Sequence, residues 1–358
     1  MINEAHGADI YTAAEKSGTD KDKIIDFSSN INPLGMPEAV KEAAINSISH
    51  SDKYPDINSR ELTRSISMAE NVPENWVFTS NGAAESIFRI VYYLKPKKGL
   101  VTAPAFSEYE NALKSAGAQA VYYNLEEEHD FKIKDDILNR INTETEIVFI
   151  CNPNNPTGQL TNKEISEKII SRCRQAGAFA VIDECFLDFS ENKEKYSVVN
   201  LLEKYDNLIV LKAFTKIYAI PGIRLGYCMS SNQRLIKGLK LSGPPWNVSA
   251  IAQAAGVAAL NEKEYAVKTV EYINKQRKYL IEELNKLNIM TYNSHANYIL
   301  FKIHANIDLK EEMLKKGILI RSCSNYMNLD NSYYRIAVKT DEENRLLINA
   351  LKEIKGMQ

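Results

Sequence analysis

The chain has 358 residues, of which 44% are hydrophobic and 25% are charged, and its formal net charge is −2. This length exceeds what one hydrophobic core usually serves, so we expect two structural units. Because the charge is nearly balanced, the sequence offers no general basic face for nucleic acid. An anionic ligand would have to be held by individually placed arginines.

Other classes of protein are disfavoured by what the sequence lacks. No apolar run is long enough to span a bilayer, and the first residues show no basic segment followed by an apolar one. The five cysteines are scattered without metal-ligand spacing, which is typical of reduced thiols and predicts no bound metal. We therefore expect a cytoplasmic protein that contacts neither a membrane nor nucleic acid.

The chain divides into three predicted parts, of which residues 1–37 are the first. This segment contains Asn30, Asn32, Pro33 and Gly35, and we expect an arm that packs against the C-terminal unit. Over residues 38–246, short apolar runs alternate with helical patterns such as the one over residues 162–176. The expected strands are Trp76–Thr79, Gly99–Thr102, Ala120–Asn124, Glu146–Cys151, Ala178–Asp183, Asn207–Leu211 and Gly226–Met229. This alternation predicts an α/β fold with a mainly parallel, seven-stranded sheet covered on both faces.

Residues 247–358 are expected to form a smaller α+β domain. A long helical pattern over about residues 248–287 leads into predicted strands and helices, and Thr340 to Glu343 have a capping-box pattern that would begin the last helix. The expected elements are the strands Tyr298–Lys302, Ile318–Arg321 and Tyr334–Val338 and a helix over Leu309–Lys316.

Polar residues stand at or just after the carboxyl ends of the predicted strands, where ligands of parallel sheets bind. Asn155 lies in the segment Asn-Pro-Asn-Asn-Pro-Thr-Gly, Asp183 closes an apolar run, and Lys216 follows the next strand, eight residues before Arg224. This order and spacing resemble the fold-type I pyridoxal-phosphate (PLP) enzymes, the aspartate-aminotransferase superfamily. Singly, each residue could be a solvated lysine or arginine, a strand-end cap or a turn asparagine; together they favour the cofactor.

The resemblance implies a role for each of these residues. Lys216 would bind the cofactor covalently and move protons, Asp183 would face the ring nitrogen, and both would be catalytic. Asn155 would bind the ring's 3-oxygen. The cofactor phosphate would contact Arg224 and the helix N-terminus at Gly82, Ala83 and Ala84. Thr215 would also bind the cofactor, and Phe106 would stack on the ring unless it is a core aromatic. Tyr54 resembles the tyrosine that reaches the neighbouring subunit's cofactor, which implies a homodimer; otherwise it is a turn residue.

Two positions depart from the superfamily pattern. Ala213 stands where many relatives carry a hydroxyl that contacts the phosphate, so one hydrogen bond of about 0.5–1.5 kcal/mol is missing. Phe186 stands where most aminotransferases place a tyrosine on the 3-oxygen. Phenylalanine cannot make that bond, so we expect a different protonation balance at the cofactor.

The N-terminal arm narrows the resemblance to one group of enzymes. The segments His-Gly-Ala-Asp-Ile-Tyr at residues 6–11 and Asp-Phe-Ser-Ser-Asn-Ile-Asn-Pro-Leu-Gly at residues 26–35, with Phe186, resemble the L-threonine-O-3-phosphate decarboxylases of cobalamin biosynthesis. Ala8 departs from the usual His-Gly-Gly. By this resemblance the substrate, a small phosphorylated amino acid, would be held by His6, Gly7, Asn30, Arg321 and Arg335.

The implied reaction is loss of CO₂ from O-phospho-L-threonine to give (R)-1-aminopropan-2-ol phosphate. The main alternative is histidinol-phosphate aminotransferase, which shares the asparagine, aspartate, lysine and arginine set and also binds a phosphorylated amine. A non-catalytic PLP-binding regulator is a third hypothesis. Such proteins generally carry an additional DNA-binding domain, and no basic patch or helix-turn-helix precedes residue 38.

Overall fold

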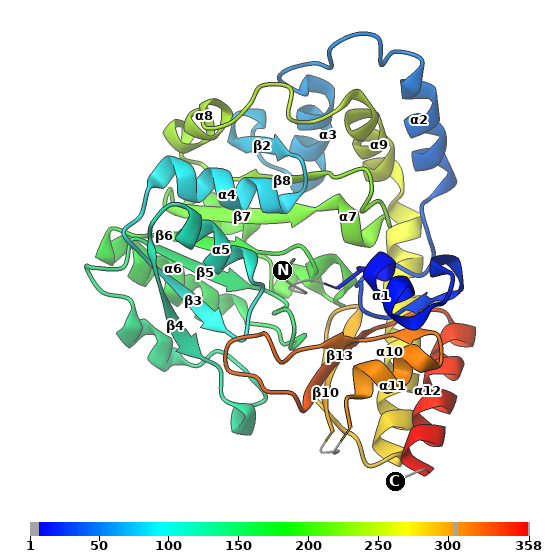
Figure 1. Ribbon diagram of the computed structural model, residues 1–358. Coiled ribbons are helices and arrows are strands. Elements are labelled where there is room, and N and C mark those ends of the chain that lie inside the picture. The colour runs from blue at the N-terminus through cyan, green and yellow to red at the C-terminus, as the bar shows by residue number, and fades with distance from the viewer. Residues whose placement is uncertain (1–6, 304–306, 357–358) are drawn as a thin grey trace.

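A computed structural model describes residues 7–303 and 307–356 (Figure 1). Its main feature is a seven-stranded sheet in which β8 runs antiparallel to both of its neighbours and all other pairs are parallel. In spatial order the strands are β2 (Val77–Ser80), β8 (Gly226–Met229), β7 (Leu208–Ala213), β6 (Phe179–Asp183), β5 (Ile147–Cys151), β3 (Lys98–Ala103) and β4 (Gln119–Asn124). The predicted mainly parallel sheet is confirmed, with strand ends within two residues of those expected.

Helices cover both faces of this sheet because its strands are apolar on both sides. Within β6, Val181 belongs to one buried cluster, whereas Ala180 and Ile182 belong to the cluster on the opposite face. A strand buried on both faces reads as a continuous apolar run, which is why the sequence pattern located it. The helices of this unit are α2 (Glu38–Ile48), α3 (Arg60–Glu70), α4 (Ala83–Leu94), α5 (Glu108–Ser115), α6 (Lys163–Ala176), α7 (Phe214–Ile217), α8 (Gln233–Leu241) and α9 (Ala250–Asn261).

The strand order creates a crevice at one place in the sheet. The chain passes from β3 outward to β4 at the edge and then returns to β5 on the other side of β3. The segments after β3 and β5 therefore diverge at their carboxyl ends, and this is where doubly wound sheets bind ligands. Phe106 follows β3 and Asn155 follows β5, so both lie at this crevice.

The C-terminal unit holds two small sheets. One is four-stranded and antiparallel, in the order β12 (Arg321–Ser322), β13 (Tyr333–Ala337), β10 (Tyr298–Lys302) and β9 (Met290–Thr291). In the other, β11 (Ile318–Leu319) pairs in parallel with β1 (Ile25–Asp26) of the N-terminal segment, which also contains α1 (Ile10–Ser17). The last helices are α10 (Lys263–Lys286), α11 (Leu309–Lys315) and α12 (Asp341–Gly356).

Two predictions in this unit are wrong in detail. The single strand expected over Ile318–Arg321 is two strands in different sheets, because the chain changes its hydrogen-bonding partner at Ile320. The single long helix expected over residues 248–287 is α9 and α10, interrupted at Glu262, whose ψ of 52° is not helical. Neither interruption has a glycine or proline to mark it.

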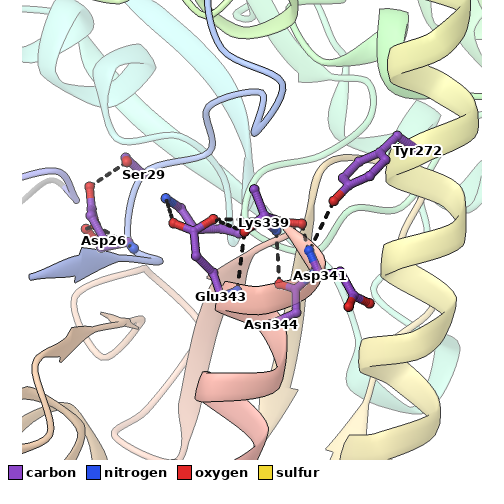
Figure 2. Close-up of polar contacts among 9 residues, drawn as sticks. Asp26, Ser29, Tyr272, Lys339, Asp341, Glu343 and Asn344 are labelled. Carbon is purple, nitrogen blue, oxygen red and sulfur yellow. Dashed lines mark hydrogen bonds and ion pairs between the residues drawn. The ribbon is translucent and has the colours of Figure 1, made fainter.

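The expected capping box at the start of α12 is confirmed. The Thr340 hydroxyl and backbone amide both donate to the Glu343 carboxylate, and the Glu343 amide donates back to the Thr340 hydroxyl. Figure 2 shows Glu343 and Asn344 grouped around Lys339 and, nearby, Asp26 accepting a hydrogen bond from Ser29 in the N-terminal segment. Asp26 also accepts from the amide and hydroxyl of Ser28, and the Ala337 amide at the end of β13 donates to the Phe27 carbonyl at 2.8 Å, which fixes this segment beside the small sheet.

No helix within residues 7–303 or 307–356 combines the length and the apolar character that crossing a membrane requires. The division of the chain at residues 37 and 246 stays a prediction, as does its location in the cell.

Candidate functional site

A cavity of about 400 Å³ lies at the carboxyl ends of the central strands. Most of the residues that the sequence singled out line it, although they come from segments far apart in the chain. These are Gly7, Asn30, Gly82, Ala83, Ala84, Phe106, Asn155, Asp183, Thr215, Lys216, Arg224 and Arg335. The parallel sheet brings them together, since its strand ends share one edge.

Lys216 lies in α7, the single helical turn that directly follows β7. Protein encloses its side chain, while the amine faces the cavity. Burial, followed by repulsion from Arg335 and Arg224, lowers the pKa of Lys216 from 10.5 to about 8, although Cys185 and Asp183 oppose the shift. About a tenth of this amine is therefore unprotonated at pH 7, against well under a thousandth for an unperturbed lysine, and the unprotonated amine is the nucleophilic form.

Asp183 is buried at the end of β6, with 4% of its surface exposed. The Tyr109 hydroxyl donates to its Oδ2 at 2.6 Å, and the Cys185 amide donates to its Oδ1 at 2.9 Å. Burial nevertheless raises the pKa of the Asp183 carboxyl. A buried carboxylate of this kind is stabilised by a cation, and a protonated heterocyclic nitrogen in the cavity would supply one.

Asn155 is held by an arginine from the small unit. Arg335 donates from Nη1 to Asn155 Oδ1 at 2.5 Å and from Nη2 to the Ser28 carbonyl at 2.7 Å. One guanidinium thus joins β13, the N-terminal segment and the loop after β5. Because the Asn155 oxygen accepts from Arg335, its amide nitrogen is left to donate into the cavity.

An anion site is formed where α4 begins. Gly82 has φ +79°, and a Cβ on it would lie 2.6 Å from Nη2 of Arg224, so only glycine lets the guanidinium come this close to the loop. A Cβ on Gly226 would collide with the backbone nitrogen of Ala83. The first amides of α4 and the Arg224 side chain therefore border the same end of the cavity, an arrangement that binds phosphate. Ala213 and Thr215 also line the cavity.

Two phenylalanines border the cavity in different ways. Phe106 packs edge-to-face on Tyr109, with ring centroids 5.7 Å apart, and presents a surface on which a planar ligand could stack. Phe186 packs edge-on against Tyr298 at 5.0 Å, and its ring centroid lies 5.8 Å from Nζ of Lys216. Because phenylalanine has no hydroxyl, Phe186 contributes an apolar surface and no hydrogen-bond donor to the cavity.

Of the predicted residues that the structure describes, Arg321 and Tyr54 do not line this cavity. Arg321 is buried beside it and donates from Nη2 to Asn325 Oδ1 at 2.9 Å, while its guanidinium lies 5.7 Å from the ring of Tyr326. Tyr54 is 80% exposed and stacks on Trp246 at 4.5 Å. His6 lies outside the described residues. The site roles of all the named residues stay predictions.

The structure also shows functional candidates that the sequence reasoning missed. Tyr109 follows Phe106 by three residues, a spacing that could have placed both at one site. Tyr326 lines the cavity, and its hydroxyl accepts a hydrogen bond from Nη1 of Arg335 at 3.4 Å. Nothing in the sequence indicated the contact between Ser28 and Arg335, which joins residues 307 positions apart.

A buried ion-pair network lies next to these strand ends. The Lys212 side chain is 6% exposed, and its Nζ lies 3.3 Å from Glu70 and 3.5 Å from Glu184. Glu184 also accepts hydrogen bonds from the Val198 amide and the Ser197 hydroxyl. Since Glu184 follows Asp183 and Lys212 precedes Ala213, this network joins the two strand ends that carry the principal site residues.

Comparison with known proteins identifies the class to which this fold and site belong. The family model for aminotransferase class I and II matches residues 22–351, so the chain belongs to that family. Within it, the chain is 35% identical to threonine-phosphate decarboxylase of Salmonella typhimurium, over 99% of this chain and 97% of that one. It is 33% identical to histidinol-phosphate aminotransferase of Methanosphaera stadtmanae, over 95% and 93%. The crystal structure of histidinol-phosphate aminotransferase from Clostridium acetobutylicum matches with a TM-score of 0.87 and 32% identity, over 93% and 99%.

Proposed function

We propose that this protein is a PLP-dependent lyase that decarboxylates O-phospho-L-threonine to (R)-1-aminopropan-2-ol phosphate, a step of cobalamin biosynthesis. The observation that carries the proposal is the similarity to a threonine-phosphate decarboxylase, which spans nearly the whole of both chains. It therefore includes the N-terminal segment, whose Gly7 and Asn30 line the cavity.

The residues of the cavity fit the cofactor. Lys216 offers an amine with a pKa of about 8, Asp183 offers a buried carboxylate for the ring nitrogen, and Arg224 with the start of α4 offers a phosphate site. Asn155 would donate to the 3-oxygen, and Phe106 would stack on the ring. When bound, PLP withdraws electrons from the substrate's Cα.

The chain's own residues would then select the reaction. Arg335 is fixed by Asn155 and Ser28 and lines the cavity, so it would offer a rigid cation to a substrate anion. In the decarboxylation the bond from Cα to the carboxylate breaks, CO₂ leaves, and Cα takes up a proton. Lys216 would deliver that proton, because an amine with a lowered pKa can serve as both acid and base.

A second candidate is a histidinol-phosphate aminotransferase. The similarity to the Clostridium acetobutylicum enzyme favours it, since that structure superposes closely at 32% identity. Arginines alone do not separate the two functions, because both substrates carry a phosphate. Phe186 favours the decarboxylase, since most aminotransferases place a tyrosine there.

The test is product identification by mass spectrometry. Purified holoprotein is given O-phosphothreonine, O-phosphoserine or histidinol phosphate separately, each with and without 2-oxoglutarate, and the Lys216→Ala variant is the control. We expect CO₂ and the amino-alcohol phosphate from O-phosphothreonine without a keto acid. Turnover of histidinol phosphate that requires 2-oxoglutarate would establish the aminotransferase instead.

The exposed Tyr54 supports a homodimer with shared sites, because its ring and that of Trp246 form an aromatic surface outside the cavity. The test is complementation between Tyr54→Phe and Lys216→Ala chains, each of which we expect to be impaired alone. If a site takes Tyr54 from one subunit and Lys216 from the other, a mixed dimer contains one intact site and regains activity. No recovery in the mixed dimer would assign Tyr54 to the surface of its own subunit.

A further inference from the structure

Residues 323–332 connect β12 to β13. The first part of this connection, residues 323–329, joins the small unit to the large sheet, and we call it the bridging loop. Figure 1 shows it extending from β13 toward β3 and β4. At its tip, Nδ2 of Asn328 donates to the carbonyl of Leu125 at 2.8 Å and to that of Ala103 at 3.2 Å. Ala103 ends β3 and Leu125 follows β4, so one side-chain amide links the loop to the ends of two neighbouring strands.

The same loop carries the substrate-facing wall of the cavity. Tyr326 lines the cavity and accepts from Arg335, and Asn325 accepts from Arg321. Within the loop, the Leu329 amide donates to the Tyr326 carbonyl at 3.1 Å. Because this hydrogen bond closes a tight turn, a displacement of Asn328 should also displace Tyr326, which lies two residues earlier.

On the large-sheet side, Asn328 contacts the segment that carries the stacking residue. The carbonyl after Ala103, that of Pro104, accepts from Asn154 at 3.0 Å, and Phe106 follows two residues later. Close by, a narrow crevice of about 40 Å³ lies between Phe106 and Tyr326. Packing there is incomplete, so the two hydrogen bonds of Asn328 give this contact its specific geometry.

We propose that Asn328 is a positioning residue that sets the distance between the substrate-facing wall at Tyr326 and the cofactor-facing wall at Phe106. This inference rests on the proposed function in so far as the cavity binds a phosphorylated substrate above a cofactor. Asn328 has φ +70°, a conformation that asparagine and glycine tolerate better than other residues. The chain therefore has here a residue that satisfies the turn and also donates two hydrogen bonds.

The experiment compares Asn328→Gly, Asn328→Asp and the control Asn331→Gly in the holoprotein. Glycine keeps the positive φ and removes the amide, whereas aspartate keeps the size of the side chain and the turn preference but cannot donate. Asn331 is exposed in the same connection between β12 and β13, and its replacement by glycine adds flexibility without removing the link. The measurements are kcat and KM for whichever substrate the wild type consumes, and hydrogen exchange over residues 323–329.

Both Asn328 variants should raise KM about tenfold, the effect of losing one to two net hydrogen bonds, with kcat within about threefold of wild type. Exchange over residues 323–329 should accelerate in both, and the control should change neither quantity. Unchanged exchange or unchanged KM in the aspartate variant would overturn the inference, as would an effect confined to glycine, which would reflect backbone flexibility alone. If the wild type ignores O-phosphothreonine and consumes histidinol phosphate, the proposed function fails, while these comparisons still decide the role of Asn328.

Discussion

The lowered pKa of Lys216 predicts an unusual effect of removing it from the cofactor-free protein. The shift from 10.5 to about 8 corresponds to about 3 kcal/mol of penalty on the folded state, which we reduce to about 2 kcal/mol because the amine faces a water-accessible cavity. Methionine is similar in length and carries no charge. The Lys216→Met variant should therefore be more stable than wild type by about 2 kcal/mol at pH 7.

The sign of the pH dependence follows from the direction of the shift. The folded-state pKa of Lys216 lies below the unfolded value, so between about pH 8 and 10.5 the unfolded wild type binds more protons than the folded form. The stability of the wild type relative to the variant should rise with pH in that window. The advantage of the variant should be complete below pH 8 and should disappear above pH 10.5.

Urea unfolding of the cofactor-free proteins from pH 7 to 11 measures this difference. Subtracting the free energy of unfolding of one protein from that of the other cancels the contributions of the titrating groups that both proteins share. Lys278→Met, at an exposed position of α10, is the matched control and should differ from wild type by less than about 0.5 kcal/mol at every pH. A Lys216→Met variant that is less stable than wild type at pH 7, or a difference that does not vary with pH, would refute the electrostatic reasoning.

Three further substitutions test the neighbouring contacts. Tyr109→Phe removes a hydrogen bond of about 1.5–3 kcal/mol to the buried Asp183 carboxylate, so the affinity for PLP, measured by spectral titration, should fall roughly 10- to 150-fold. An unchanged affinity would show that this tyrosine does not contribute to cofactor binding. Gly226→Ala places a methyl group against the backbone nitrogen of Ala83, so the variant should have a lower Tm in thermal scans and a lower PLP content in absorbance spectra. A wild-type Tm together with a wild-type PLP content would contradict the close packing. Lys212→Met leaves buried carboxylates unpaired and should lower the free energy of unfolding, measured by urea titration, by about 3–5 kcal/mol, whereas Lys212→Arg should recover most of this loss. A methionine variant as stable as wild type would mean that the ion pairs do not stabilise the fold.

Much of the large sheet could be predicted from the sequence because its strands are buried on both faces. A run such as Phe179 to Ile182 is apolar without interruption, and the aspartate that ends it marks the strand's carboxyl end. Once the sheet is parallel, the residues after each strand must meet at one edge. This is why Asn155, Asp183 and Lys216 could be expected in one cavity from their positions alone.

The remaining features depend on contacts between distant segments. The change of sheet at Ile320 depends on where β1 lies, and the interruption at Glu262 involves no glycine or proline. The Tyr109–Asp183 hydrogen bond joins residues 74 positions apart, and no local pattern indicates it. Asn328 has the composition of an ordinary turn, and only the fold shows that its amide contacts the ends of β3 and β4.

We propose that Lys216 binds PLP covalently in the cavity that also holds Asp183. Borohydride reduction of the purified holoprotein, followed by digestion and mass spectrometry, tests it directly. We expect one pyridoxyl-modified peptide, with the modification on Lys216, and none in the Lys216→Ala protein. A reducible adduct on another lysine, or one that persists in the Lys216→Ala protein, would rule out Lys216 as the residue that binds PLP.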